Sequence, residues 1–173
     1  MSEIKVDHLV DGVNPSGSTN LTFNPLPPAL GLSLVNQYTV RKIYKLRKSI
    51  FNKLSLVINN IMAKKPYQVA KVYRFQAIDV CNRFNSVSYF YDMQRLYPLT
   101  PQEYAIVNSC SDNLNTKWEN DCPLIKLGKE KYPELINFFN YVEKELKYKD
   151  LHAGNVMKDK SGNFKLIDLE GFI

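Results

Sequence analysis

Asp150-Leu151-His152-Ala153-Gly154-Asn155, followed a short turn later by Leu166-Ile167-Asp168, is the most informative pattern in this sequence. Its pattern is an Asp, an Asn at D-L-x-x-x-N spacing, and a second Asp at the end of an apolar strand. Phosphoryl transfer needs a carboxylate to orient the attacking hydroxyl group and oxygen ligands for magnesium. The pattern therefore predicts a phosphoryl-transfer site with Asp150 as the orienting carboxylate.

The residues between the two motifs predict a hairpin. Short strands are expected over Val156 to Lys158 and Phe164 to Ile167, around a cluster of turn residues from Asp159 to Asn163. A hairpin returns the chain beside its start, so Asn155 and Asp168 should lie at the same end. Magnesium prefers oxygen donors from one or two side chains together with phosphates and water, and these two residues provide such donors.

These residues resemble the protein-kinase-like superfamily. The loop from Asp150 to Asn155 is similar to its catalytic loop, particularly the D-L-H-x-G-N form of aminoglycoside and choline phosphotransferases and of atypical or phage-encoded kinases. Leu166-Ile167-Asp168 resembles the magnesium-binding strand end of that family. The resemblance implies ATP and Mg²⁺ as cofactors, and it places His152 where protein kinases usually carry a phosphate-facing lysine. The implied site residues are the catalytic Asp150 and His152 and the metal and nucleotide ligands Asn155 and Asp168.

The resemblance also has departures. Tyr148 and Lys149 replace the His-Arg or His-Gly that normally precede the Asp, and the segment from Asp168 to Gly171 is one residue longer than D-F-G. Glu170 in that segment is a further candidate ligand. By the resemblance, residues 34–173 correspond to the middle of a kinase truncated at both ends, without the front of the small lobe or the C-terminal helices.

The segment from Thr39 to Lys64 predicts a long amphipathic helix. Its apolar residues recur at helical spacing, at Ile43, Leu46, Ile50, Leu54, Val57, Ile58 and Ile61. Arg41, Lys45 and Lys48 share another face, and the segment contains no Asp or Glu. This basic face is either a solvated surface or a surface for an acidic partner, phosphate groups or nucleic acid; no base-recognition motif accompanies it.

Two strands of a small antiparallel sheet are expected after this helix, over Tyr67 to Phe75 and over Ser86 to Met93. The residues from Met93 to Leu96 resemble the kinase hinge, which implies that Met93 and Leu96 contact the nucleotide. On this alignment the basic helix takes the place of helix C, and Lys71 lies on the fourth strand. The lysine that binds phosphates and the helix C glutamate are then both missing.

Further helices should lead to the catalytic loop. Thr100-Pro101-Gln102-Glu103 predicts a capping box at a helix start, and the segment from Pro133 to Lys147 has one apolar helical face. The fold class is therefore α+β: a partial kinase-like fold with a long basic helix, a small antiparallel sheet, and helices that lead to a catalytic-loop hairpin. Residues 1–33 are predicted to form an extended arm, since Asp11 to Gly31 is rich in Pro, Gly, Ser and Asn, and residues 34–173 a minimal kinase-like domain.

Composition restricts the setting. The chain has 173 residues, 45% of them hydrophobic, which is enough for a core, and its net charge is +6. Cys81, Cys110 and Cys122 have no metal-ligand spacing, which favours a reducing compartment. Without a long uncharged span or a signal-like N-terminus, no membrane partner is expected. The expected location is the cytoplasm. If the protein is of viral or phage type, this is the cytoplasm of the host cell.

Two functions fit these residues. The first is a minimal kinase-like phosphotransferase with a hydroxyl phosphoacceptor, weakly active or inactive alone; the second is a pseudokinase, a degenerate kinase fold acting as a protein-binding inhibitor or decoy. The retained Asp150, Asn155 and Asp168 favour the first, whereas the missing lysine and glutamate favour the second. Apolar surface left where C-terminal helices would pack predicts a protein partner or a homo-oligomer.

Overall fold

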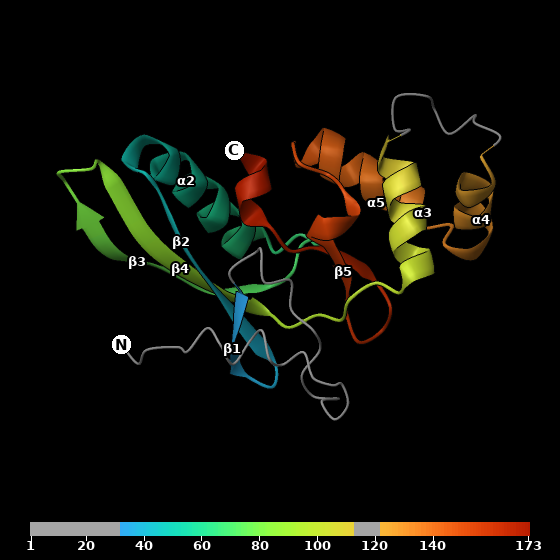
Figure 1. Ribbon diagram of the computed structural model, residues 1–173, viewed down its shortest axis with the longest axis horizontal. Helices are drawn as coiled ribbons and strands as arrows, with labels where there is room; N and C mark the ends of the chain where they lie inside the picture. Colours follow the sequence, from blue (N-terminus) through green and yellow to red (C-terminus); the bar gives the residue numbers. More distant parts are fainter. Residues whose placement is uncertain (1–31, 113–121) are drawn as a thin grey trace. The chain divides into compact units, whose positions relative to one another are not determined.

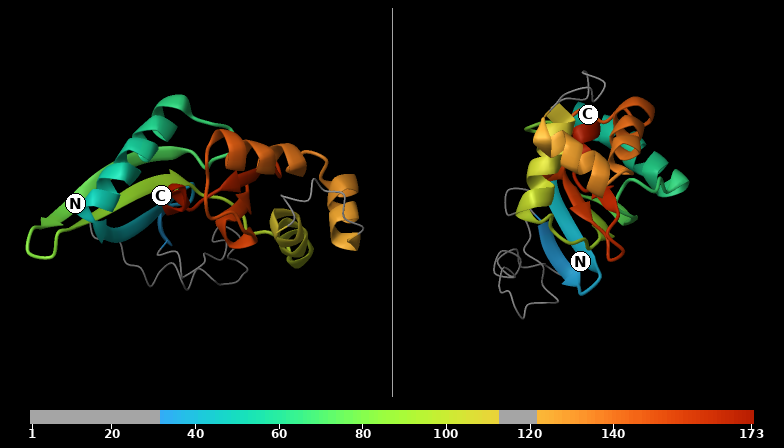
Figure 2. Two further views of the ribbon diagram at one scale, coloured as in Figure 1. Left: turned by 90° about the horizontal axis from the view of Figure 1, so that it is seen from above. Right: turned by 90° about the vertical axis from the view of Figure 1, so that its right-hand side faces the viewer.

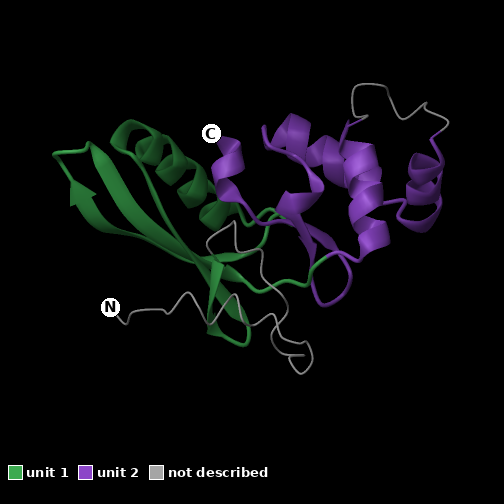
Figure 3. Cartoon of the chain, viewed as in Figure 1, with its two compact units in different colours: residues 1–98 green, residues 99–173 purple. Residues whose placement is uncertain are grey.

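The computed structural model describes residues 32–112 and 122–173, and the chain divides into two compact units between Pro98 and Leu99 (Figure 3). Helices and antiparallel strands occur together in these described ranges, which confirms the α+β class (Figure 1). The predicted arm over residues 1–33 lies outside the described residues except for its last two positions, which begin a strand.

The first unit is built on a four-stranded antiparallel sheet with the order β1-β2-β4-β3. The strands are β1 (Leu32–Asn36), β2 (Thr39–Arg47), β3 (Val72–Cys81) and β4 (Ser86–Gln94). The strand predicted over Ser86 to Met93 is confirmed as β4. The strand predicted over Tyr67 to Phe75 is correct only from Val72 onward, and it continues to Cys81 as β3.

The helix predicted over Thr39 to Lys64 is wrong in its first part. Thr39–Arg47 is β2, and the helix α2 runs over Lys48–Lys64. The physical reason is long-range pairing: every residue of β2 has a partner on β4, from Thr39 opposite Gln94 to Arg47 opposite Ser86. Such a ladder outweighs a local helical spacing of apolar residues, because tertiary context overrides local propensity.

Helix α2 packs on one face of this sheet (Figures 1 and 2). It buries Leu54, Ile58 and Ile61, which lie at the helical spacing that the sequence predicted. Near its start Phe51 meets the sheet, with ring centroids 5.7 Å from Phe75 and 5.4 Å from Tyr89. The predicted apolar face of α2 is therefore confirmed at these three positions, whereas Ile50 near the helix start is 37% exposed.

The opposite face of the sheet contains a buried ion pair between neighbouring strands. Arg41 on β2 donates from Nε to Oδ1 of Asp92 at 2.5 Å and from its terminal nitrogen to Oδ2 at 2.9 Å. The same guanidinium lies 3.9 Å from the ring centroid of Phe90. The sequence predicts Arg41 on the basic face of a helix, as a solvated residue or as part of a surface for an acidic partner; it is instead buried and paired, because β2 places it directly opposite Asp92.

The second unit holds helices followed by a small hairpin. Its elements are α3 (Pro101–Asp112), α4 (Pro123–Lys131), α5 (Leu135–Asn140), the π-helical turn η3 (Tyr141–Glu145), the 3-10 turn η4 (Ala153–Asn155), β5 (Val156–Lys158), β6 (Phe164–Leu166) and the 3-10 turn η5 (Leu169–Phe172). The predicted capping box is confirmed, since Thr100 and Glu103 exchange backbone-to-side-chain hydrogen bonds at 3.0 and 3.2 Å. The helix predicted over Pro133 to Lys147 corresponds to α5 and η3.

No helix in the described ranges is both long enough and apolar enough to cross a membrane.

The Arg41–Asp92 pair yields a prediction about stability. Arg41→Ala should lower the free energy of unfolding by about 3–5 kcal/mol, because it leaves a buried carboxylate without its partner. Denaturant unfolding followed by circular dichroism measures the change. The matched control is Lys45→Ala on the same strand, where the side chain is exposed, and its effect should stay within about 0.5 kcal/mol. An equal loss in both variants would show that the buried pair has no special weight.

Candidate active site

The hairpin predicted between the two motifs is present in the second unit. Strands β5 and β6 pair in antiparallel register from Val156 opposite Leu166 to Lys158 opposite Phe164. The turn is closed by Asp159, whose Oδ1 accepts from the backbone N–H groups of Ser161 and Asn163, both at 2.9 Å. The hairpin therefore returns the chain to the loop from which it started.

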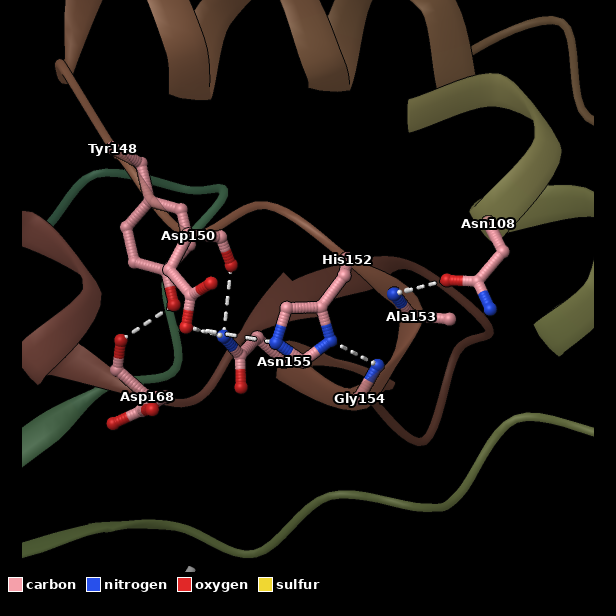
Figure 4. A network of polar contacts seen from close by, with 8 residues as sticks. All are labelled: Asn108, Tyr148, Asp150, His152, Ala153, Gly154, Asn155 and Asp168. Carbon is pink, nitrogen blue, oxygen red and sulfur yellow. Dashed lines mark hydrogen bonds and ion pairs between the residues drawn. The ribbon is translucent and has the colours of Figure 1, made fainter. Parts of the chain in front are cut away.

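Asn155 joins the loop that begins at Asp150 to this hairpin. Its side-chain amide donates to the backbone oxygen of Asp150 at 2.8 Å and to the carboxylate Oδ2 of Asp150 at 3.1 Å. Its backbone oxygen accepts from Ile167 N–H at 3.1 Å. Asn155 is only 1% exposed, whereas the Asp150 side chain is 60% exposed. A buried amide thus holds an accessible carboxylate, and Figure 4 shows the amide oxygen of Asn155 directed away from Asp150.

Asp168 is held to the same loop by Tyr148. The Tyr148 hydroxyl donates to the backbone oxygen of Asp168 at 2.7 Å (Figure 4). Lys149 N–H donates to the backbone oxygen of Gly171 at 2.8 Å, so the segment after β6 is bound to the residues directly before Asp150 at two points. The backbones of Asp150, Asn155 and Asp168 are therefore brought together in one unit, and the shared task of their side chains at a phosphate site stays a prediction.

The environment of Tyr148 is strongly negative. Burial raises the pKa of Tyr148, and the charges of Asp168, Asp150 and Glu170 raise it further. The phenol therefore keeps its proton and stays a hydrogen-bond donor throughout the neutral pH range. Three carboxylates near one buried ring also produce a local field that favours a cation.

Gly171 explains how the chain after Asp168 fits against Tyr148. A Cβ atom built on Gly171 would lie 2.3 Å from Cζ of the Tyr148 ring, a distance that real side chains do not reach. Phe172 then packs against the other part of the same ring, with centroids 4.8 Å apart. Because Gly171 has no side chain, its backbone can pass close to the Tyr148 ring. This contact helps to hold the Tyr148 hydroxyl where it donates to the Asp168 backbone.

His152 lies beside Asp150 at the surface. Its Nδ1 accepts a hydrogen bond from Gly154 N–H at 3.0 Å, so the neutral imidazole carries its proton on Nε2. Nε2 lies 3.5 Å from Oδ2 of Asp150, and both side chains are about half exposed. The structure therefore brings His152 to the predicted site, on the solvent side of Asp150, and its catalytic role stays a prediction.

Helix α3 supports the loop and the hairpin from one side. Oδ1 of Asn108 accepts from Ala153 N–H at 2.9 Å, and Glu103 forms a salt bridge with Lys158 of β5, with Nζ 2.8 Å from Oε1. Burial alone would raise the pKa of Glu103, but hydrogen bonds from Lys158 and Thr100 lower it below its usual value. Sequence reasoning identified Glu103 as a capping residue and missed these second partners, because no local pattern connects α3 to β5.

The donor set can be compared with what magnesium requires. Among the residues that the structure describes, no group of three or more His, Cys, Asp or Glu side chains is arranged to hold a metal ion. Asn155 and Asp168 offer an amide oxygen and a carboxylate, which are the hard donors that magnesium takes when phosphates and water complete its shell. The residues therefore fit a magnesium ion that is bound together with a nucleotide, and not a dedicated metal cage.

Met93 and Leu96 lie in the other compact unit. Met93 is buried on β4 between Val40 and Val72, and Leu96 is buried just beyond the strand. Their predicted contact with a nucleotide stays a prediction. The sequence predicts that no phosphate-binding lysine lies on a strand before the helix, on the assumption that residues 39–47 are helical. That assumption is wrong, because these residues form β2, which leads into α2. Strand β2 carries Lys42, and this residue is buried.

No protein-family model matches the chain, and no curated protein matches it either. The functional assignment therefore depends on the residues and contacts described above.

The hydrogen bond from Tyr148 to Asp168 can be tested by removing one atom. Tyr148→Phe keeps the ring packing against Phe172 and should lower the free energy of unfolding by about 0.5–1.5 kcal/mol, the usual net value of one hydrogen bond. Denaturant unfolding measures it. The control is Tyr141→Phe at a more exposed ring of the same unit, where no loss is expected. If both variants are equally stable, the Tyr148 hydroxyl does not hold Asp168.

Proposed function

We propose that this chain is a minimal kinase-like phosphotransferase that transfers a phosphoryl group from ATP to a hydroxyl group. The observation that supports this most directly is the amide of Asn155, which binds Asp150 while its own backbone is tied to the strand that ends at Asp168. An ordinary turn does not require Asp150, Asn155 and Asp168 to lie close together. Phosphoryl transfer requires it, because the acceptor and the phosphates must be held close together and in line.

Each residue has a distinct task in this proposal. Asp150, half exposed and held by Asn155, would accept a hydrogen bond from the acceptor hydroxyl and take up its proton as the oxygen–phosphorus bond forms. Asn155 and Asp168 would hold magnesium together with the phosphates. When bound, the ion offsets the negative charge of the phosphates and of the leaving ADP oxygen. The phenol of Tyr148 stays protonated and fixes the backbone of Asp168.

ATP with Mg²⁺ should raise the thermal midpoint of the wild-type chain. Asp168→Ala should abolish that rise, because one of two proposed ion ligands is lost. Differential scanning fluorimetry with and without Mg²⁺ measures both effects. Asp112→Asn, an exposed carboxylate at the end of α3, is the matched control and should respond like the wild type. An ATP response that is absent, or that persists in Asp168→Ala, would contradict the nucleotide site.

Binding and catalysis can be separated at Asp150. Asp150→Asn should keep the ATP-induced thermal shift and reduce phosphoryl transfer by about a hundredfold or more, because the group that takes the proton is lost. Transfer is measured as ADP release in the presence of a panel of protein and small-molecule hydroxyl acceptors, with autophosphorylation as the simplest case. A variant as active as the wild type would remove Asp150 from the proposed mechanism.

A second function is favoured by one feature of the first unit. Helix α2 contains no Asp or Glu over Lys48–Lys64, so it offers no carboxylate that could pair with a phosphate-binding lysine. A chain with this defect would work as a pseudokinase, a fold kept to bind or inhibit another protein. That alternative predicts no thermal response to ATP with Mg²⁺. It also predicts no phosphoryl transfer above background, so that Asp150→Asn does not differ from the wild type. The same experiments therefore separate the two functions.

A further inference from the structure

Strand β3 forms an edge of the four-stranded sheet among the described strands. It is ten residues long, and the backbone N–H and C=O groups that point away from β4 can pair with another strand. Several of its apolar side chains are exposed: Tyr73 is 52%, Ile78 41% and Val80 48% exposed. A long edge with exposed apolar residues is a site where another strand is expected to bind.

The usual protections of such an edge are weak in β3. Soluble proteins block edges with lysine, proline, unmatched charges or bulges; β3 contains no Lys and no Pro, and its protection is limited to two irregularities of register. Its register against β4 is irregular between Val72 and Arg74 and between Ala77 and Asp79. At these irregularities the extra residues are Tyr73 and Ile78, which are apolar and exposed. They favour contact with a partner over repulsion.

The two charges of β3 are arranged symmetrically. Arg74 is the third residue of the strand, and Asp79 is the third from its end. They are opposite Asp92 and Ser88 of β4, which lie an even number of residues apart, so Arg74 and Asp79 project from the same face of the sheet. Both side chains are exposed. Reversing the direction of β3 therefore exchanges the position of its cation with that of its anion.

We infer that β3 pairs antiparallel with β3 of a second copy of this chain, which joins two four-stranded sheets about a twofold axis. In a twofold interface each contact occurs twice, so Arg74 of each copy lies opposite Asp79 of the other. Opposite charges across paired strands stabilise the pair. A parallel, in-register arrangement would instead bring Arg74 against Arg74 and Asp79 against Asp79, which is repulsive.

The charge pattern also favours a second copy over an unrelated chain. A foreign strand would need a cation and an anion at matching positions, whereas a second copy supplies both without further requirement. The apolar side chains agree, because the exposed Tyr73 near one end of β3 approaches Val80 near the other end in an antiparallel pair. The surface is therefore complementary to itself.

Charge reversal on the full chain tests this interface. Sedimentation velocity over a concentration series should show a concentration-dependent dimer for the wild type. Arg74→Glu and Asp79→Arg should each raise the dimer dissociation constant by about tenfold or more, because each places like charges opposite one another twice. The double variant carrying both changes should restore dimerisation, since Glu at 74 then faces Arg at 79. Lys53→Glu, an exposed position on α2, is the charge-matched control and should dimerise like the wild type.

Several outcomes would overturn the inference. A wild type that is monomeric at all concentrations would do so, as would single variants that dimerise as well as the wild type. A double variant that stays monomeric while its circular dichroism spectrum is native would do the same. Arg74→Glu also removes a hydrogen bond to Gln76, so Asp79→Arg is the variant that decides if Arg74→Glu does not fold.

Discussion

The side-chain amide of Asn155 is the contact on which the rest of the candidate site depends. It is buried, and its NH₂ group donates to both the backbone oxygen and the carboxylate of Asp150. A buried amide without partners costs free energy, so the loop is stable in the arrangement that satisfies it. Because the Asn155 backbone also binds Ile167, one residue sets both the orientation of Asp150 and the position at which β6 ends.

Tyr148 supports Asp168 through a neutral side chain. Its phenol donates to the backbone of Asp168 at a position where the superfamily that the loop sequence resembles usually has His. An imidazole changes its charge near neutral pH, and three carboxylates nearby would bias it toward the cation. The buried phenol has a raised pKa in the same field and stays neutral. The hydrogen bond from Tyr148 to Asp168 is therefore insensitive to pH across the neutral range.

The sequence predicted the parts of the structure that are encoded locally. The turn after β5, the capping box of α3 and the strand β4 are specified by residues a few positions apart, and all three are present. The segment Thr39–Arg47 was misassigned because its apolar residues fit a helical period as well as a strand, and its pairing with β4 decided the outcome. The salt bridge of Glu103 with Lys158 joins residues 55 positions apart, and no local pattern shows such a contact.

Because residues 39–47 form β2 and not a helix, the net positive charge of the chain gives less support for a nucleic-acid partner. A continuous basic helix face was the main support for a nucleic-acid partner, and it required Arg41, Lys45 and Lys48 to be neighbours on one helix. Arg41 is buried against Asp92, and Lys45 lies on a strand, so neither belongs to α2. A phosphate backbone attracts proteins through arrays of accessible cations, and one of the three predicted here is already neutralised inside the first unit. The net positive charge of the chain is therefore weaker support for nucleic-acid binding than the sequence suggested.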